Sequence, residues 1–293
     1  MNIFNGLEKI VESNYRLAHQ GWYGLGGPAD YFVRPETVDQ LKEVVKRCEE
    51  NGIRIYVMGY GSNVLISDEG LRGAVIKLEA EEFTQTQFDG EQLTAWSGAG
   101  LNDLTLTCVR KGLSGIEALS GIPGTIGGAV RMNAGGSFGD IGTVVDSVTV
   151  MDYQGRVFER SRPELMFDYR SSNITAKFIL NAKLNLTTAE PEQVMQTLKE
   201  VWIYKKNSQP LNTRNCGCIF KNPRGVSAGA LIDRAGLKGL QIGGAVVSDK
   251  HANFIVAREV CKSRDVIRLI EVVRQRVKER FDVELEREIE IWD

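Results

Sequence analysis

Hydrophobic residues recur at helical spacing in several stretches of the chain. Between Thr37, a typical N-cap residue, and Gly52, apolar side chains return every three or four positions and predict one buried helical face. Asn102 predicts the start of a second helix, which ends at Gly112. Two further helices are predicted, one after Pro191 and one from Ser263 to about Arg280.

Alternating apolar and polar positions predict strands elsewhere. Residues 144–151 and 156–160 alternate on either side of Asp152-Tyr153-Gln154-Gly155, which indicates a β-hairpin. Residues 178–186 alternate with period two and predict another strand. A final strand is predicted over 283–291, with apolar side chains on one face and glutamates on the other.

Composition and charge narrow the class of protein. Of 293 residues, 42% are hydrophobic and 25% charged, as in globular proteins of two or three domains. The net charge of −2 gives no basic face for nucleic acid, and no apolar run reaches the ~20 residues that cross a bilayer. The N-terminus lacks the basic-then-apolar order of a signal peptide. We therefore expect no nucleic acid or membrane partner.

Cysteine and histidine offer little material for metal chemistry. The five cysteines are an odd number without metal-type spacing, which is typical of reduced thiols in the cytosol. His19 and His251 are the only histidines, too few for a histidine-based metal site or hydrolytic triad. We expect a cytoplasmic protein without a bound metal.

Two glycine-rich segments carry candidate binding chemistry. Residues 114–139 combine glycine with apolar side chains and are interpreted either as backbone that binds a phosphorylated ligand or as tight turns between core strands. The turn Gly59-Tyr60-Gly61-Ser62-Asn63 joins the apolar strand 53–58 directly to the apolar stretch 64–66. Because no helix follows this turn, it is not a Rossmann dinucleotide site. It still offers backbone N–H groups and two polar side chains to an anion.

These segments, with five others in the same order, resemble the UDP-N-acetylenolpyruvoylglucosamine reductase (MurB) family. The resemblance spans nearly the whole chain, and the short connection after Tyr169-Arg170 is similar to the compact, type II-like branch of that family. The segments are GYGSNVLISDEGLRG (59–73), SGIPGTIGGAVRMNAG (120–135), FDYRSS (167–172), CGCIFKNP (216–223), AGLKG (235–239), VSDKHANFIV (247–256) and LEREIEI (285–291).

The resemblance implies an α+β fold: a two-part FAD-binding domain of the PCMH/vanillyl-alcohol-oxidase type, then a smaller α+β substrate-binding domain. It divides the chain into an N-terminal helix and lead-in over 1–25, the FAD-binding domain over 26–190 and the MurB-type substrate domain over 191–293. A break in the hydrophobic pattern at 187–192 agrees with this division.

The activity implied by the resemblance is that of UDP-N-acetylmuramate dehydrogenase. NADPH would reduce FAD, which would reduce the enolpyruvyl ether UDP-N-acetyl-3-O-(1-carboxyvinyl)glucosamine to UDP-N-acetylmuramate for peptidoglycan synthesis. Neither glycine-rich segment contains histidine or cysteine, so we expect FAD to be bound non-covalently. We expect a monomer or a weak oligomer.

The resemblance also implies which residues bind FAD. They belong to the two glycine-rich segments and are Gly59, Tyr60, Gly61, Ser62, Asn63, Gly121, Ile122, Pro123, Gly124, Thr125, Gly127, Gly128, Asn133, Ala134 and Gly135.

Two catalytic residues are implied in separate motifs. Arg170 matches the family arginine at the substrate carboxylate, and its planar guanidinium can pair two oxygens at once. Cys218 stands where the family motif Gly-Ser-x-Phe-Lys-Asn-Pro has its serine proton donor. A thiol, with a reference pKa of about 8.5, is a stronger acid than an alcohol and can donate in its place. A small buried hydrophobe is the other interpretation of Cys218.

The third catalytic residue cannot be chosen by periodicity. Four glutamates, at 284, 286, 288 and 290, share one face of the final strand, and only the family motif selects Glu288 as the acidic partner of the enolate. Tyr169, Lys221 and Asn222 match substrate-binding positions. The family's substrate-phosphate lysine falls on Ser208, and Lys205 or Lys206 is the candidate to replace it.

Two other functions fit the same residues. A flavin oxidase on this fold often holds its flavin through a covalent bond to histidine or cysteine, which the glycine-rich segments lack. A non-catalytic nucleotide-binding module is the second alternative, since the proton donor has changed. The joint presence of Arg170, Cys218 and Glu288 argues for the reductase.

Overall fold

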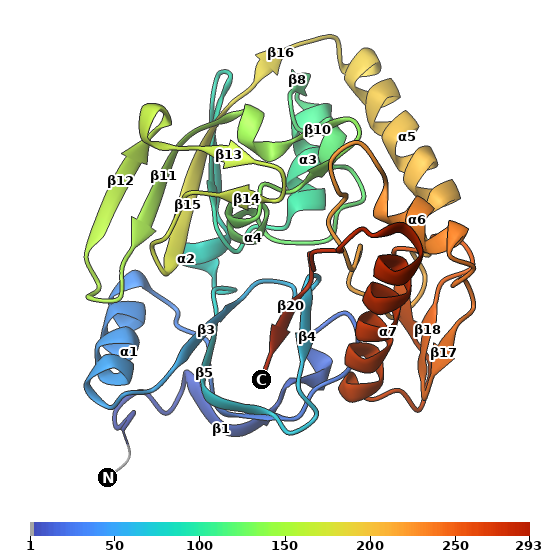
Figure 1. Ribbon diagram of the computed structural model, residues 1–293. Helices are drawn as coiled ribbons and strands as arrows, with labels where there is room; N and C mark the ends of the chain where they lie inside the picture. Colours follow the sequence, from blue (N-terminus) through green and yellow to red (C-terminus); the bar gives the residue numbers. More distant parts are fainter. Residues whose placement is uncertain (1–2) are drawn as a thin grey trace. The chain divides into compact units, whose positions relative to one another are not determined.

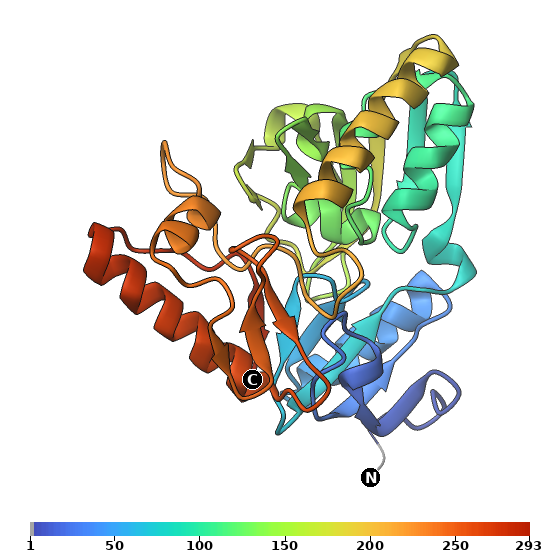
Figure 2. The same cartoon turned by 90° about the vertical axis from the view of Figure 1, so that its right-hand side faces the viewer.

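The computed structural model describes residues 3–293, which form two compact units that are discontinuous in sequence (Figures 1 and 2). Unit 1 contains the chain up to Asn14, Asp30–Gly59 and Gly73–Tyr204. Unit 2 contains Tyr15–Ala29, Tyr60–Arg72 and Lys205–Asp293. The predicted domain boundaries at residues 25 and 190 stay a prediction. The two compact units differ from that division, because Tyr15–Ala29 and Tyr60–Arg72 belong to the same unit as the C-terminal part of the chain.

The main sheet of unit 1 has five antiparallel strands in the order β12-β11-β15-β7-β6 (Figure 1). The predicted hairpin is confirmed as β11 (Val145–Met151) and β12 (Val157–Ser161), and the predicted strand at 178–186 as β15 (Phe178–Asn185). Asp152 builds the hairpin turn by accepting from the amides of Gln154 and Arg156. β6 is Thr86–Asp89 and β7 is Gln92–Trp96.

Helices α3 (Leu101–Arg110) and α4 (Ile126–Arg131) share one buried cluster with this sheet. Leu104 and Cys108 of α3 are buried in it with Val148 of β11 and Ala182 of β15. Burial of apolar side chains on one face of each element is the main stabilising contribution here. This core therefore fixes the two segments that flank α4.

The second part of unit 1 is built around helix α1 (Val38–Glu50), as predicted. Thr37 is its N-cap, and its hydroxyl accepts from the amide of Gln40 at 3.2 Å. Strands β3 (Ile55–Met58) and β5 (Leu71–Lys77) pair in parallel within a sheet of order β1-β2-β5-β3. β1 is Val11–Arg16 and β2 is Pro28–Val33.

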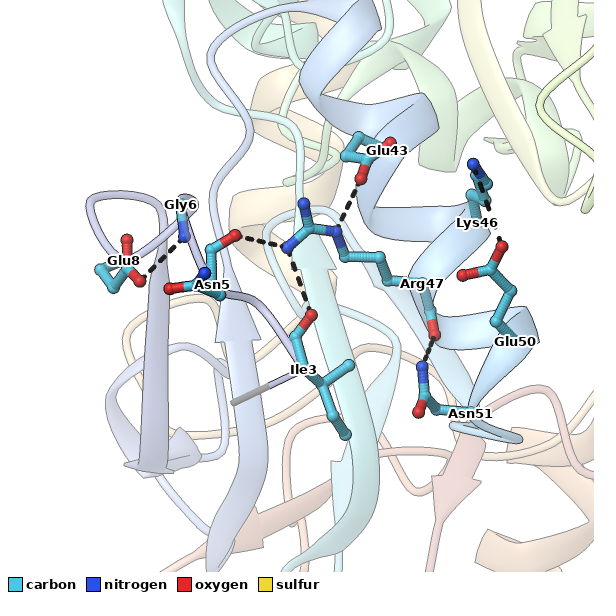
Figure 3. Close-up of polar contacts among 9 residues, drawn as sticks. All are labelled: Ile3, Asn5, Gly6, Glu8, Glu43, Lys46, Arg47, Glu50 and Asn51. Atoms are coloured by element: carbon cyan, nitrogen blue, oxygen red, sulfur yellow. Dashed lines mark hydrogen bonds and ion pairs between the residues drawn. The ribbon is translucent and has the colours of Figure 1, made fainter. Parts of the chain in front are cut away.

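The predicted N-terminal helix within residues 1–25 is wrong for the described part of that segment. Residues 3–10 form turns, and β1 follows at once. Gly6 has φ +84°, which breaks helical geometry, and Arg47 of α1 donates to the carbonyls of Ile3 and Asn5 (Figure 3). Residues 3–10 therefore form turns that hydrogen bonds from Arg47 attach to α1.

Unit 2 is formed by α6 (Ala228–Arg234), α7 (Ser263–Phe281) and the sheet β17-β18-β19, against which α7 packs (Figure 2). The predicted helix from Ser263 is confirmed. The predicted final strand is shorter than expected: β20 (Glu290–Trp292) pairs in parallel with β4 (Val64–Ile66). β17 is Gln241–Ile242, β18 is Ala245–Val247 and β19 is Ile255–Ala257.

The remaining elements are short except for helix α5 (Pro191–Ser208), which was predicted. No helix within residues 3–293 is long and apolar enough to cross a bilayer. The short elements are α2 (Glu81–Thr84), β8 (Leu113–Ser114), β9 (Gly135–Gly136), β10 (Gly139–Asp140), β13 (Phe167–Asp168), β14 (Ser171–Ser172), β16 (Thr187–Thr188) and the 3-10 turns Leu17–His19, Glu117–Leu119, Ile141–Thr143 and Arg162–Glu164.

Candidate functional site

The first glycine-rich turn runs between β3 and β4, so the strand–turn–strand prediction is confirmed. Gly61 has φ +64°, a conformation that a side chain strains. A Cβ on Gly59 would lie 2.7 Å from Thr125 Oγ1, which belongs to the second glycine-rich segment. Within unit 1, glycine at 59 therefore allows the two candidate FAD segments to touch.

The second segment is held on one side by the strand end before α3. Ile126 N donates to Ala99 O at 3.0 Å, and Gly127 N donates to Ser97 O at 2.8 Å. A Cβ on Gly127 would lie 2.8 Å from the Cβ of Ser97, so this glycine is required by protein packing. Gly128, by contrast, is exposed, and its Cβ would meet only Thr125 Oγ1 at 3.6 Å. At Gly128, therefore, the backbone of this segment is exposed to solvent.

Asn102 supports the start of this segment and does not cap a helix as predicted. Gly100 occupies the N-cap of α3, and Asn102 Oδ1 accepts from Gly121 N at 3.0 Å. A cavity of about 440 Å³ adjoins this contact, lined by α3, α5 and residues Ser120 and Gly121. The capping prediction is wrong because the Asn102 side chain instead accepts a hydrogen bond from a backbone N–H 19 residues away.

Asn133 and Arg170 are linked through a tight hairpin in unit 1. Strands β13 and β14 leave Tyr169 and Arg170 as the two turn residues, and Arg170 has φ +54°. Such a conformation costs a non-glycine residue on the order of 1 kcal/mol or more and is found preferentially at functional sites. The buried Asn133 amide donates to Asp168 O at 3.0 Å and accepts from Gly142 N at 2.9 Å. Its side chain therefore holds the Arg170 turn.

Cys218 and Glu288 are brought together in unit 2 by backbone pairing. Glu288 N donates to Ile219 O at 2.8 Å, Lys221 N donates to Glu286 O at 2.9 Å, and Phe220 bridges to Arg287. The segment that begins at Cys218 therefore runs beside the one that carries Glu288. Both side chains are half-buried.

Burial now separates the four glutamates that periodicity left equivalent. Glu284 and Glu286 have side chains 76% and 72% exposed, and Glu290 is also exposed. Glu288 alone of the four is half-buried. A partly buried carboxyl beside the Cys218 segment is the arrangement expected of a functional group. Water screens the charge of a fully exposed carboxyl and weakens its effect on neighbouring groups.

The first glycine-rich turn joins the same assembly. Asn63 Nδ2 donates to Glu288 O at 3.1 Å, and Glu290 N donates to Asn63 O at 3.0 Å. Cys216 is buried, and its thiol contacts Val64 O at 3.3 Å and Gly61 O at 3.6 Å. Residues 60–64, Cys218 and Glu288 are thus tied together within unit 2. The Cys216 contact was not predicted, since nothing in the local sequence points to a partner 152 residues away.

The other predicted substrate residues are partly engaged within the protein. Asn222 Oδ1 accepts from Ala228 N at 2.9 Å, at the start of α6, and Lys221 Nζ pairs with Glu286 at 2.6 Å. Lys205 is only 6% exposed, whereas Lys206 is exposed. Of the two lysines, Lys206 is the one accessible to a diphosphate from solvent.

Cysteine exposure yields a prediction about thiol reactivity. Burial raises the pKa of Cys48, Cys108 and Cys216 to about 12 and that of Cys261 to about 11, whereas Cys218 is half-buried. Because only accessible thiolate reacts quickly, one equivalent of a disulfide reagent should react rapidly in the native protein and five after denaturation. The rapid equivalent should vanish in Cys218→Ser. Two rapid equivalents in the native protein would contradict the burial pattern.

No cluster of three or more metal-type side chains occurs in residues 3–293. His251 is partly buried; burial, and secondarily the charge of Lys238, lowers its pKa, and its Nδ1 accepts from Asn253 N at 3.2 Å. This histidine is therefore part of the protein's hydrogen-bonding framework.

Comparison with known proteins gives matches over both halves of the chain. A family model described as FAD binding domain matches residues 29–161, and one described as UDP-N-acetylenolpyruvoylglucosamine reductase, C-terminal domain, matches residues 209–292. The UDP-N-acetylenolpyruvoylglucosamine reductase of Clostridium novyi is 37% identical over 96% of this chain and 92% of its own. That of Clostridioides difficile is 40% identical over 92% of this chain and 89% of its own.

Solved structures agree with these matches. The crystal structure of UDP-N-acetylenolpyruvylglucosamine reductase (MurB) from Thermus caldophilus has a TM-score of 0.84 and 37% identity, covering 97% of this chain and 99% of that one. A Phl p 4 variant, a glucose oxidase, has a TM-score of 0.50 at 17% identity over 65% of this chain and 45% of its own. The second likeness concerns the fold alone. Together they confirm the predicted α+β fold with an FAD-binding domain of the flavin-oxidase type.

Proposed function

Because the chain belongs to the UDP-N-acetylenolpyruvoylglucosamine reductase family, we propose that it reduces the enolpyruvyl ether of this UDP-sugar with electrons that pass from NADPH through FAD. The observation that carries the proposal is the hydrogen-bonded assembly of unit 2. There, Cys218, Glu288 and the Gly61–Asn63 turn are tied together through Ile219, Asn63 and Cys216. These are an acid, a carboxylate and a candidate flavin-binding turn.

The two glycine-rich segments fit a non-covalently held FAD. Glycine at 59 lets the backbone approach Thr125, and the exposed backbone at Gly128 leaves space for a phosphate group. Neither segment contains a histidine or cysteine that could attach the flavin. We also propose a cytoplasmic location, since all five cysteines are free thiols, as is usual in a reducing compartment.

FAD, when bound, supplies to the terminal alkene carbon of the substrate the hydride that it receives from NADPH. Negative charge then develops on the neighbouring carbon and is delocalised into the substrate carboxylate as an enolate. The residues of the chain must stabilise this charge and deliver one proton.

Arg170 is proposed to bind the substrate carboxylate and stabilise the enolate. Its place in a two-residue turn, supported by the buried Asn133, restricts the backbone from which the guanidinium projects. A preorganised cation does not need to reorient as charge develops, which is how such groups lower a barrier. Tyr169, whose ring lies 5.2 Å from the guanidinium carbon of Arg170, is proposed to support it and to contact the substrate.

Cys218 is proposed to donate its thiol proton to C2 of the enolate, with Glu288 as the acidic partner beside the reacting carbon. The new C–H bond forms as the S–H bond breaks, and the thiolate regains a proton from solvent before the next turnover. We propose that the nucleotide sugar is held by Lys221, Asn222 and Lys206. Lys206 would replace the family's phosphate-binding lysine, whose position is taken by Ser208 in this chain.

The enolate assignment predicts a separation of the two half-reactions. Arg170→Ala and Glu288→Gln should each slow oxidation of the reduced flavin by the enolpyruvyl nucleotide by about 10²- to 10³-fold, because a group aimed at developing charge is lost. Flavin reduction by NADPH should change little. Stopped-flow absorbance of the flavin measures both rates.

Glu290→Gln is the matched control, since Glu290 is exposed and two residues from Glu288 on the same chain segment. It should behave as wild type in both half-reactions. If Arg170→Ala or Glu288→Gln slowed both half-reactions equally, the residue would have a general binding or folding role, and the assignment would be wrong.

A further inference from the structure

Asn253 is a buried residue whose side-chain amide bonds directly to the segment that follows the proposed proton donor. Asn253 is 2% exposed, and both the oxygen and the nitrogen of its side-chain amide form hydrogen bonds with a single residue, Phe220. Asn253 Oδ1 accepts from Phe220 N at 3.0 Å, while Nδ2 donates to Phe220 O at 2.8 Å. In addition, Asn253 O accepts from Ile219 N at 2.9 Å. Three backbone groups of the two residues after Cys218, namely Ile219 N, Phe220 N and Phe220 O, are therefore bonded to Asn253.

The opposite side of the same segment is held by the chain that carries Glu288. Ile219 O accepts from Glu288 N, and Lys221 N donates to Glu286 O. The segment 219–221 thus lies between Asn253 and residues 286–288, much like a central strand whose neighbour on one side is a side-chain amide. Removing that amide leaves buried backbone groups of Phe220 without partners, which is costly and displaces them.

Asn253 is itself contacted by His251 and by helix α6. Its N–H donates to His251 Nδ1 at 3.2 Å, and a Cβ on Gly229 of α6 would come within 3.6 Å of the Asn253 Cβ and 3.2 Å of His251 Cε1. Glycine at 229 therefore permits α6 to pack directly on the His251–Asn253 pair. This rear contact limits the freedom of Asn253 to follow a displaced segment.

We propose that Asn253 is a positioning residue, which sets the placement of the Cys218 thiol relative to Glu288 by clamping the Ile219–Phe220 backbone. Because Asn253 is 2% exposed and both ends of its side-chain amide bond to Phe220, it acts on the donor through the backbone and not by binding the substrate. The inference rests on the proposed role of Cys218 as proton donor, and it adds a residue that acts on that donor through the backbone. Displacement of a reacting group by about 1 Å is enough to slow a step by ~10²-fold.

The first test is Asn253→Ser, which shortens the side chain and removes both bonds to Phe220. Native-state hydrogen exchange should show faster exchange at Phe220 N–H, while the amides of α7 stay protected. Flavin oxidation by the enolpyruvyl nucleotide should slow by ~10²-fold, with flavin reduction by NADPH changed by less than about threefold. Unchanged exchange at Phe220, or equal slowing of both half-reactions, would overturn the proposal.

Asn253→Asp supplies a second readout that a merely structural role would not move. An ionised carboxylate can accept from Phe220 N but repels Phe220 O, whereas a protonated carboxyl can do both, accepting with one oxygen and donating with the other. The ratio of variant to wild-type oxidation rate should therefore rise as the pH falls. Because a carboxylate at 253 would raise the pKa of the adjacent His251, the ratio is measured with His251→Gln in both proteins, so that only the new carboxyl titrates at this place. A ratio that does not change with pH would contradict the clamp.

Ser263→Ala is the matched control, because Ser263 is also buried and donates to a backbone carbonyl, that of Ile66, without contacting the Cys218 segment. It should lower stability but leave the ratio of the half-reaction rates unchanged. If both Asn253 variants fail to fold, the residue is purely structural and the proposal is wrong. If wild-type reduced flavin is not oxidised by the nucleotide, the proposed function fails, while the exchange at Phe220 still decides whether Asn253 clamps this segment.

Discussion

Replacing Cys218 by alanine is expected to abolish turnover while leaving flavin reduction by NADPH intact. Loss of a positioned general acid typically costs about 10²- to 10⁴-fold, and here it affects only the half-reaction in which the enolate is protonated. Cys218→Ser should stay active, because serine is the residue that the family motif carries at this position. Stopped-flow measurement of the two half-reactions gives both results in one experiment.

Cys108→Ala is the control for removing a cysteine as such. Cys108 is buried in the core of unit 1, so this variant should lose stability but keep turnover. Deuterium carried by labelled nicotinamide should still exchange into the substrate C3 position in Cys218→Ala, since hydride transfer can precede protonation. Full turnover of Cys218→Ala would remove the thiol from the mechanism and make it a core side chain.

Gly128→Leu is expected to yield folded but colourless protein. Gly128 lies on the exposed side of α4, and a Cβ there meets only ordinary van der Waals contact, so the fold accepts leucine. Leucine also favours the helix by about 1 kcal/mol over glycine. If the flavin pyrophosphate rests on this backbone, the leucine side chain occupies its space. The absorbance at visible wavelengths and the melting temperature together measure the effect.

Gly136→Leu is the matched control for that substitution, because a Cβ at Gly136 has no atom within 4 Å and the residue is exposed. This variant should keep its flavin. Gly127→Leu is a poor probe, since its clash with Ser97 would damage the protein with or without flavin. Full flavin content in Gly128→Leu would place the pyrophosphate away from α4.

The sequence predicts most of the regular elements because their signals are local. Helix α1 follows from the Thr37 cap and a buried apolar stripe, and the β11–β12 hairpin follows from alternation around the Asp152 turn. These signals involve neighbours within a few residues, so hydrophobic periodicity and capping are sufficient to identify them. The motifs that carry the family resemblance are also short stretches of sequence, and they identify the fold class and the two glycine-rich segments.

Local patterns mislead where a distant partner competes. A helix is predicted near the N-terminus, within residues 1–25, but the positive φ of Gly6 and the bonds from Arg47 make residues 3–10 a series of turns. Asn102 is a good N-cap residue by type, yet its oxygen binds the amide of Gly121. In both cases the contact that decides the structure joins residues far apart in sequence, which no window of local sequence contains.

The same reason explains what was missed in the candidate site. Cys216 and Asn253 lie in segments that carry the family resemblance, but no local pattern indicates their contacts, because their partners lie 152 and 33 residues away. Periodicity also leaves the four C-terminal glutamates equivalent; the family motif selects Glu288, and its burial separates it from the other three. The residues that hold a site in place are thus harder to predict than those whose chemistry the motif itself indicates.

The central claim is tested most directly by the visible spectrum of the purified protein during a single turnover. The protein should be yellow with bound FAD, lose its colour anaerobically when NADPH is added, and regain it when UDP-N-acetylenolpyruvoylglucosamine follows. Acid precipitation should release the flavin into the supernatant, as expected for a non-covalent cofactor. Reduced flavin that is reoxidised by oxygen but not by the enolpyruvyl nucleotide would contradict the account and favour an oxidase.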